Sequence, residues 1–315
     1  MNENDIQKEL DKVIEEAKIR VNIDVTSKFN RPIKILQIDP TDVCQAACPQ
    51  CARETDKEFY RDNKRHLKLG TLLTLINHDE IMSLDKMFMC GNYGDPAASH
   101  NTLEIFRHFR ETNPQITLGM NSNGGLQSTF WWYELAKILN QPTDYVVFSI
   151  DGLETTNSDY RVNVKWDKVM QNAEAFISAG GNAHWDMLAF KHNEHQIEDC
   201  KKLAKEMGFK WFRLKVTNRP LVKKLEYPVN FSRPEVVYGD IKCRALENQS
   251  AYVDSRGKLY PCCWLATPMT SEKINFDEIQ ASWDTDSPHP TCKSTCASCE
   301  NQSNFTNQWL YEIEL

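Results

Sequence analysis

The chain has 315 residues, of which 41% are hydrophobic and 26% charged, and its formal net charge is −7 at pH 7. This composition is typical of a folded globular protein, and the acidic balance argues against a general nucleic-acid binder. The sequence holds no run of about eighteen apolar residues, so we expect no membrane span.

The N-terminal residues 1–30 predict a charged amphipathic helix, because apolar residues recur there at helical spacing from Ile6 to Val21. They lack the apolar core of a secretory signal peptide, and we therefore expect a cytoplasmic protein. Disulfides are disfavoured in that compartment, so metal binding is the better explanation for eleven cysteines. Cys90 and Cys200 stand apart from the other nine and are expected to be core thiols.

Strand-like and helix-like segments alternate over residues 31–217. This alternation predicts parallel strands joined by crossover helices, with Gly208 as the stop signal of the last helix. The predicted strands are 33–38, 86–90, 116–120, 145–150, 184–190 and 211–216. The predicted helices are 71–83, 102–112, 129–139, 165–178 and 194–207.

The alternation ends near residue 218. An irregular segment leads to a hairpin-like stretch at 251–264, with its turn at 255–257, then to a short helix near 276–282 and a cysteine-rich end. We expect 218–315 to form a second, smaller domain. It has too few apolar residues to be stable without a bound metal or another cross-link.

Cys44, Cys48 and Cys51 follow the first predicted strand with the spacing C-x3-C-x2-C. Thiolates hold iron–sulfur clusters, and a cluster with three protein ligands leaves one iron open to a small molecule. A zinc loop that borrows a distant fourth ligand, or three ordinary buried cysteines, are the alternatives.

This cysteine spacing resembles that of the radical S-adenosylmethionine (SAM) enzymes. The resemblance implies an α/β fold, a partial (β/α)6 TIM-like barrel over residues 31–217. It also implies a [4Fe–4S] cluster whose open iron binds SAM, and an external electron donor such as flavodoxin or ferredoxin. That family usually places an aromatic residue near the adenine, just before the third cysteine, where this chain has Gln50.

A second group of cysteines begins with the pattern C-x13-G-x4-C, from Cys243 to Cys262, and ends with C-x3-C-x2-C. It resembles the SPASM module, or its shorter twitch form, which carries auxiliary iron–sulfur clusters. The resemblance implies one auxiliary [4Fe–4S] cluster, with Cys263 and Cys292 as spare thiols; a four-cysteine zinc staple is the alternative. The expected ligands are Cys243, Cys262, Cys296 and Cys299.

The second predicted strand runs into Gly94, Asp95 and Pro96, which are similar to the family's Gly-Gly-Glu-Pro stretch that receives the SAM ammonium. These residues are also ordinary turn formers. Arg161 stands where relatives place an arginine near the SAM carboxylate, and a surface salt bridge is its alternative role. The resemblance implies further SAM contacts at Asn121, Ser122, Asn123, Ser149 and Asp151.

Alternation along the last two strands turns Asp186, Arg213 and Lys215 toward the barrel interior. Two inward cations suggest a polar or anionic small-molecule substrate, unless Arg213 and Asp186 pair with each other. Asp186 is our candidate for the base that accepts a substrate proton, with His184 and Lys191 in reserve.

The resemblance therefore implies a radical SAM oxidoreductase that takes hydrogen from a polar substrate. An auxiliary cluster favours a two-electron oxidation, because it can accept the second electron. A peptide- or protein-modifying SPASM maturase is the first alternative, although residues 1–30 are too few for the winged-helix domain that binds leader peptides. A non-enzymatic iron–sulfur or zinc protein is the second.

Overall fold

The computed structural model describes residues 31–55, 64–217, 219–222, 224–232, 237–266, 275–298 and 311–315. The helix predicted over 1–30 and the predicted ligand Cys299 lie outside these residues. None of the described helices is long and apolar enough to cross a membrane.

The described strands form one nine-stranded sheet in the order β8-β7-β1-β2-β3-β4-β5-β6-β9. The six central strands run parallel, each beside its neighbour in sequence, as the alternation predicted. This confirms the α/β fold with a partial TIM-like barrel. The six strands are β1 (Ile35–Ile38), β2 (Lys86–Met89), β3 (Thr117–Ser122), β4 (Tyr145–Ser149), β5 (Ala183–Ala189) and β6 (Trp211–Val216).

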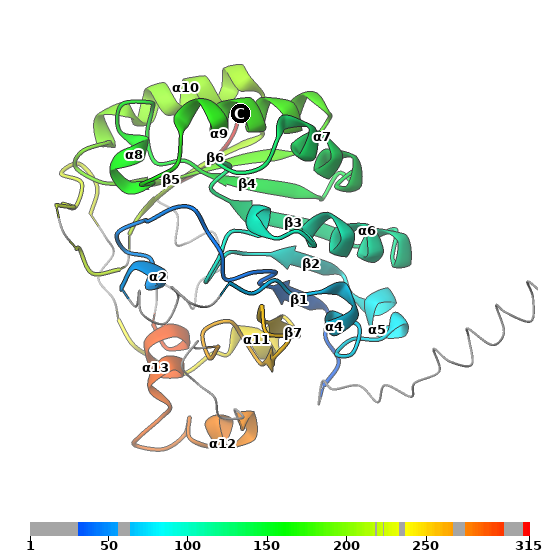
Figure 1. Cartoon of the computed structure of the whole chain (residues 1–315). Coiled ribbons are helices and arrows are strands. Elements are labelled where there is room, and N and C mark those ends of the chain that lie inside the picture. The colour runs from blue at the N-terminus through cyan, green and yellow to red at the C-terminus, as the bar shows by residue number, and fades with distance from the viewer. Residues whose placement is uncertain are drawn as a thin grey trace, which may run out of the picture.

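Helices connect these strands, and Figure 1 shows the longer ones along one side of the curved sheet. The last of them ends at Gly208 in the left-handed conformation (φ 87°), which confirms the predicted stop. The connections are α2 (Ala52–Thr55), α4 (Leu69–Leu72), α5 (His78–Ser83), η1 (Pro96–Ala98), α6 (Thr102–Thr112), α7 (Thr129–Ile138), α8 (Asn157–Tyr160), α9 (Trp166–Ser178), η2 (Glu194–Gln196) and α10 (Ile197–Met207).

The single helix predicted over 71–83 is wrong, because two short helices, α4 and α5, occupy this region. Asn77 caps α5: its side chain accepts the Glu80 N–H at 2.9 Å, and the Glu80 carboxylate accepts the Asn77 N–H at 2.8 Å. This reciprocal capping box starts a new helix at Asn77, although the helical spacing of apolar residues continues across this point and predicts a single helix.

The C-terminal residues extend both edges of the sheet. The predicted hairpin is present as β7 (Ser250–Val253) and β8 (Leu259–Tyr260), and β7 also pairs in parallel with β1. At the other edge, β9 (Tyr311–Glu314) pairs antiparallel with β6. The segment predicted as a separate small domain thus supplies strands that cover the open edges of the central sheet. It also contains α11 (Arg244–Glu247), α12 (Phe276–Ala281) and α13 (Pro290–Cys296).

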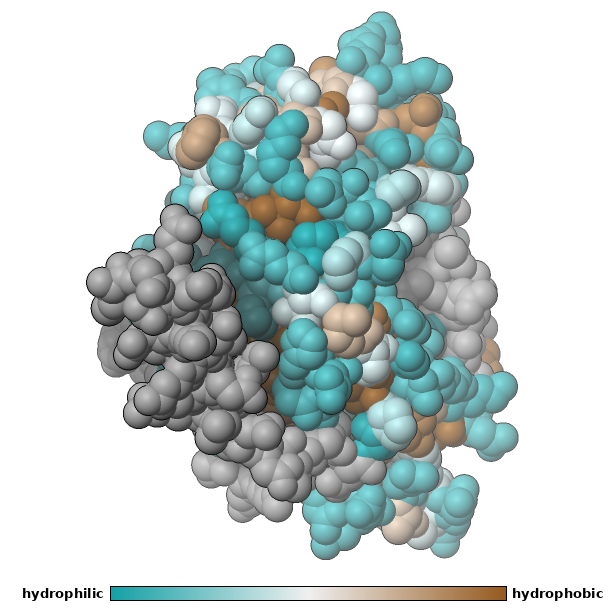
Figure 2. All heavy atoms as spheres, turned by 90° about the vertical axis from the view of Figure 1, so that its right-hand side faces the viewer, coloured by the Kyte–Doolittle hydropathy of each residue, from teal (hydrophilic) through white to brown (hydrophobic). Residues whose placement is uncertain are grey.

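Side chains of the central strands alternate between a fully buried face and a partly buried face. On β5 and β6, Trp185 and Phe212 belong to the buried face, whereas Asp186 and Arg213 lie on the other, as predicted. The face of the molecule to the right in Figure 1 is mainly hydrophilic, with apolar side chains in recessed patches (Figure 2).

Candidate functional site

The loop after β1 carries Cys44, Cys48 and Cys51. Cys48 is buried and the other two are half-buried. Burial, together with charges on Asp95 and Cys48, raises the pKa of the Cys44 thiol to about 12. Burial likewise raises the pKa of Cys48, and a charge on Cys51 adds to this effect. The three thiols therefore lie close enough to affect one another.

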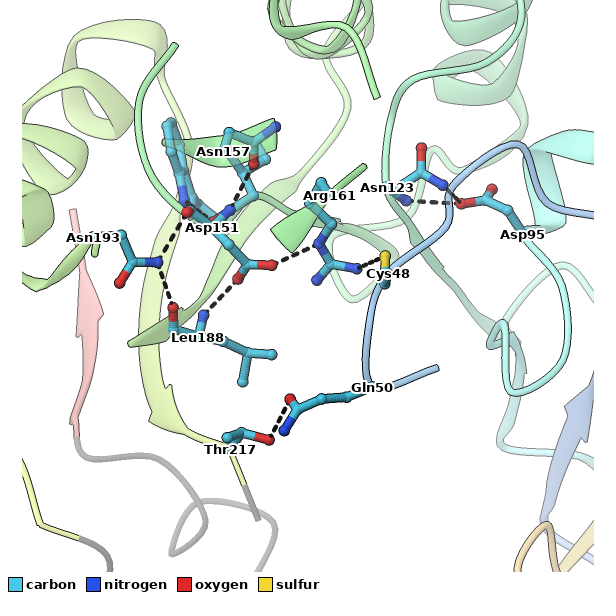
Figure 3. A network of polar contacts seen from close by, with 12 residues as sticks. Cys48, Gln50, Asp95, Asn123, Asp151, Asn157, Arg161, Leu188, Asn193 and Thr217 are labelled. Atoms are coloured by element: carbon cyan, nitrogen blue, oxygen red, sulfur yellow. Dashed lines mark hydrogen bonds and ion pairs between the residues drawn. The ribbon is translucent and has the colours of Figure 1, made fainter. Parts of the chain in front are cut away.

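Nitrogen donors surround two of these sulfur atoms. The Cys44 Sγ accepts the Ala46 N–H at 3.4 Å and the Asn123 Nδ2 at 3.5 Å, and the Arg161 Nη1 lies 3.9 Å from the Cys48 Sγ (Figure 3). Donors and a cation at sulfur stabilise the thiolate, which is the form that binds metals. The donor set therefore fits a cluster with three thiolate ligands.

In the described part of the chain, no three His, Cys, Asp or Glu side chains are arranged to hold a single metal ion. A [4Fe–4S] cluster places a different demand on its ligands, since each thiolate binds a separate iron. The lack of a single-ion site among these residues therefore does not argue against a cluster at the three loop thiols.

The turn after β2 packs tightly against the loop that carries the three thiols. The Asp95 N–H donates to the Val43 carbonyl at 2.8 Å. A Cβ on Gly94 would lie 2.1 Å from the carbonyl oxygen of Thr41, and one on Gly91 would lie 1.9 Å from that of Gly94. Only glycine fits at both positions, so these residues fix the turn against the cysteine loop.

The Asp95 carboxylate points toward the end of β3 rather than outward. It accepts hydrogen bonds from the Ser122 Oγ at 2.8 Å, the Ala97 N–H at 2.9 Å, and the Asn123 N–H and Nδ2 at 2.8 and 2.7 Å (Figure 3). Its side chain therefore orients Asn123 toward Cys44. The SAM contact that the resemblance implies for Asp95 stays a prediction.

A second network joins Asp151 to the cysteine loop. The buried Asp151 Oδ2 accepts the Arg161 Nε at 2.6 Å, and Oδ1 accepts the Leu188 N–H at 2.6 Å (Figure 3). The salt bridge considered for Arg161 is present as its ion pair with Asp151, but this pair is buried and does not lie at the surface. Burial opposes the charge of Arg161, but Asp151 and Cys48 outweigh it and raise the arginine's pKa. A fixed cation thus lies beside Cys48.

Gln50, which replaces the family's aromatic residue, is buried and bound to the end of β6. Its Oε1 accepts the Thr217 Oγ1 at 3.0 Å, and its Nε2 donates to the Pro220 carbonyl at 2.9 Å. The Arg219 Nη1 donates to the Gln50 carbonyl at 2.8 Å. No sequence pattern predicts this link, which joins the loop after β1 to the opposite end of the six-strand series.

Asp186 and Arg213 pair with each other, which is the alternative considered for them. The Arg213 Nε and Nη2 lie 2.5 and 2.8 Å from the two Asp186 oxygens, and Glu312 of β9 lies 3.8 Å from Nη1. Burial raises the pKa of Asp186 to about 6, although Arg213 opposes the shift. The positive charge of Arg213, which was expected to bind a substrate, is therefore already balanced by the carboxylates of Asp186 and Glu312.

The reserve bases differ in position. His184 lies on the same face as Asp186; burial lowers its pKa to about 3, and neither buried ring nitrogen has a hydrogen-bond partner among the described residues. Lys191 is exposed and pairs with Glu226 at 2.7 Å, so it lies away from the interior. Lys215 is half-buried on the inward face.

The second cysteine group gathers four described thiols. Cys296 donates a hydrogen bond to Cys243, and charges on Cys243 and Cys292 both raise the pKa of Cys262, after burial. Cys263 interacts with Cys262 and also lies near Asp39 and Asn92. The structure thus favours Cys262 over Cys263 as a ligand and keeps Cys292 within the group.

The two remaining thiols differ from each other. Cys200 is fully buried, as predicted for a core thiol. Cys90 is half-buried at the end of β2, where burial raises its pKa and a charge on Cys263 adds to the shift.

No family model matches the sequence, and no curated protein matches it. The fold does match solved structures. SuiB from Streptococcus suis bound to S-adenosylmethionine has a TM-score of 0.55 at 16% identity, over 81% of this chain and 66% of that chain. SuiB bound to its precursor peptide SuiA has a TM-score of 0.55 at 15% identity, over 81% and 65%.

The enzyme anSMEcpe with bound AdoMet has a TM-score of 0.53 at 17% identity, over 75% of this chain and 73% of that chain. This chain covers just under two thirds of SuiB. The fold is that of the radical SAM enzymes.

Proposed function

We propose that this chain is a radical SAM oxidoreductase, which cleaves SAM reductively to the 5′-deoxyadenosyl radical and abstracts hydrogen from a polar substrate. The observation that carries the proposal is the arrangement of Cys44, Cys48 and Cys51 beside the Asp95 and Asp151 networks. A [4Fe–4S] cluster held by these thiols would bind SAM and supply the electron for its cleavage.

The chain's own residues keep this site in one geometry. Asp151 holds Arg161 beside Cys48, and Asp95 holds Asn123 beside Cys44. Both carboxylates are buried and lie behind the residues that they orient. Such outer partners fix ligand orientation around metal sites. Arg161 retains donors that suit a carboxylate such as that of SAM.

The second thiol group supports the oxidative form of the proposal. Cys243, Cys262 and Cys296, with Cys292 or Cys299, offer enough thiolates for one auxiliary cluster, which could accept the second electron. Asp186 remains the proposed proton acceptor, because its pKa of about 6 suits proton transfer near neutral pH. A flavodoxin or ferredoxin remains the proposed electron donor.

A peptide-modifying maturase is the second candidate. SuiB was solved with its precursor peptide SuiA, and anSMEcpe with a Kp18Cys peptide, the latter at a TM-score of 0.53. The pairing of Arg213 with Asp186 and Glu312 also weakens the argument for an anionic small molecule.

The test is the release of 5′-deoxyadenosine after anaerobic reconstitution, reduction with dithionite and addition of SAM. We expect wild type to release it and the Cys44/Cys48/Cys51 triple Ala variant not to. Cys200→Ala is the matched control, since this buried thiol lies outside both groups. Equal release by wild type and triple variant, or none from an iron-loaded wild type, would refute the proposal.

A further inference from the structure

Arg31 lies against the C-terminal cysteine segment, although it precedes β1 in the chain. Its Nη1 donates to the Ala245 carbonyl at 2.9 Å, and its Nη2 donates to the carbonyls of Ser250 at 2.7 Å and Pro261 at 3.4 Å. The guanidinium carbon also lies 5.6 Å from the centre of the Phe276 ring. Three carbonyls and an aromatic face therefore hold this guanidinium in one position.

The position places a positive charge beside two of the gathered thiols. Burial lowers the pKa of Arg31, whereas charges on Cys243 and Cys262 act in the opposite direction. Within the described residues no carboxylate forms an ion pair with Arg31. Its hydrogen-bond partners in the described part of the chain are neutral carbonyls, so none of the acids described there cancels its charge.

We propose that Arg31 is a cation that raises the electron affinity of the auxiliary iron–sulfur site. The inference rests on the proposed function, because it requires a cluster at the second cysteine group. Reduction adds one electron, the one that the substrate radical loses on oxidation, while the substrate's proton goes to a base. The charge of the site falls by one, so a fixed cation stabilises the reduced form and raises the reduction potential.

The charge can be separated from the three hydrogen bonds by two substitutions. Arg31→Lys keeps the charge but cannot reproduce the planar fork, whereas Arg31→Gln keeps part of the hydrogen bonding and removes the charge. If Arg31 only held the start of β1 against the C-terminal segment, both variants would lower the melting temperature. The midpoint potential of the cluster would then not depend on whether the variant keeps the positive charge.

The experiment is a redox titration followed by electron paramagnetic resonance, on the full chain with Cys44, Cys48 and Cys51 replaced by Ala. This background leaves the auxiliary cluster as the source of the signal. We expect Arg31→Gln to shift the midpoint potential to a more negative value and Arg31→Lys to leave it near that of the parent. Arg107→Gln is the control, because it removes an exposed arginine that pairs with Glu134 between α6 and α7.

A cluster whose potential is the same in the parent and in Arg31→Gln would overturn the inference, as would equal shifts in Gln and Lys variants. If Arg31→Gln does not retain iron, Arg31→Met takes its place as the variant without the charge: a more negative potential supports the inference, and the potential of the parent overturns it. A parent that binds zinc or no iron would instead contradict the proposed auxiliary cluster itself.

Discussion

At the scale of single residues, the carboxyl of Asp39 shows how burial sets a charge. Asp39 directly follows β1, is 1% exposed, and accepts the N–H groups of Asn92 and Tyr93 at 3.5 and 3.3 Å. Burial raises its pKa to about 8, a shift that these hydrogen bonds only partly oppose. The folded protein therefore holds a proton on Asp39 at pH values where the unfolded chain has lost it.

This shift predicts a pH dependence of stability. Between about pH 4 and pH 8 Asp39 is protonated in the folded state and ionised in the unfolded state, so its contribution to the free energy of unfolding falls as the pH rises. We expect Asp39→Asn to reduce this fall, by an amount on the order of 1 kcal/mol or more. Anaerobic urea unfolding at pH 5 and pH 8 measures it, and identical differences in wild type and variant would contradict the account.

The side chain of Gln50 gives a second prediction. Gln50→Ala leaves the Thr217 hydroxyl and the Pro220 carbonyl without their partner, and we expect a loss of about 1–3 kcal/mol in unfolding free energy. Because the same side chain anchors the cysteine loop, the variant should also bind SAM more weakly in equilibrium titrations. Gln115→Ala, at an exposed position, is the control. Unchanged stability and SAM affinity would show that the link is not needed.

At the scale of elements, strands distant in sequence pair with both outer strands of the six-stranded parallel part of the sheet. β7 covers β1, and β9 covers β6 while placing Glu312 near Arg213. Unpaired edge strands invite association with other chains, so these additions protect the central sheet.

We therefore expect deletion of residues 311–315 to lower the melting temperature and to promote aggregation, as measured by calorimetry and light scattering. Glu312→Gln is the matched variant, since it removes the charge near Arg213 but keeps the strand. It should aggregate no more than wild type. A deletion variant as stable and monomeric as Glu312→Gln would contradict this role of β9.

At the scale of the whole molecule, the features that could be predicted from the sequence are those that depend on local residue patterns. The strand periodicity placed Asp186 and Arg213 on one face, and the cysteine spacings placed both thiol groups. The pairing of β7 with β1 depends on contacts between residues more than two hundred positions apart, which local periodicity does not encode. Local periodicity also does not encode the hydrogen bonds of Asp95, because its partners Ser122 and Asn123 lie at the end of β3, 27 and 28 positions away.

The central claim is that two iron–sulfur sites with different roles occupy one chain. Its most direct test is the iron and sulfide content after anaerobic reconstitution, in wild type and in the Cys44/Cys48/Cys51 triple Ala variant. We expect about eight irons per chain in wild type and about four in the variant. Four irons or fewer in wild type, or the same iron content in both proteins, would contradict it.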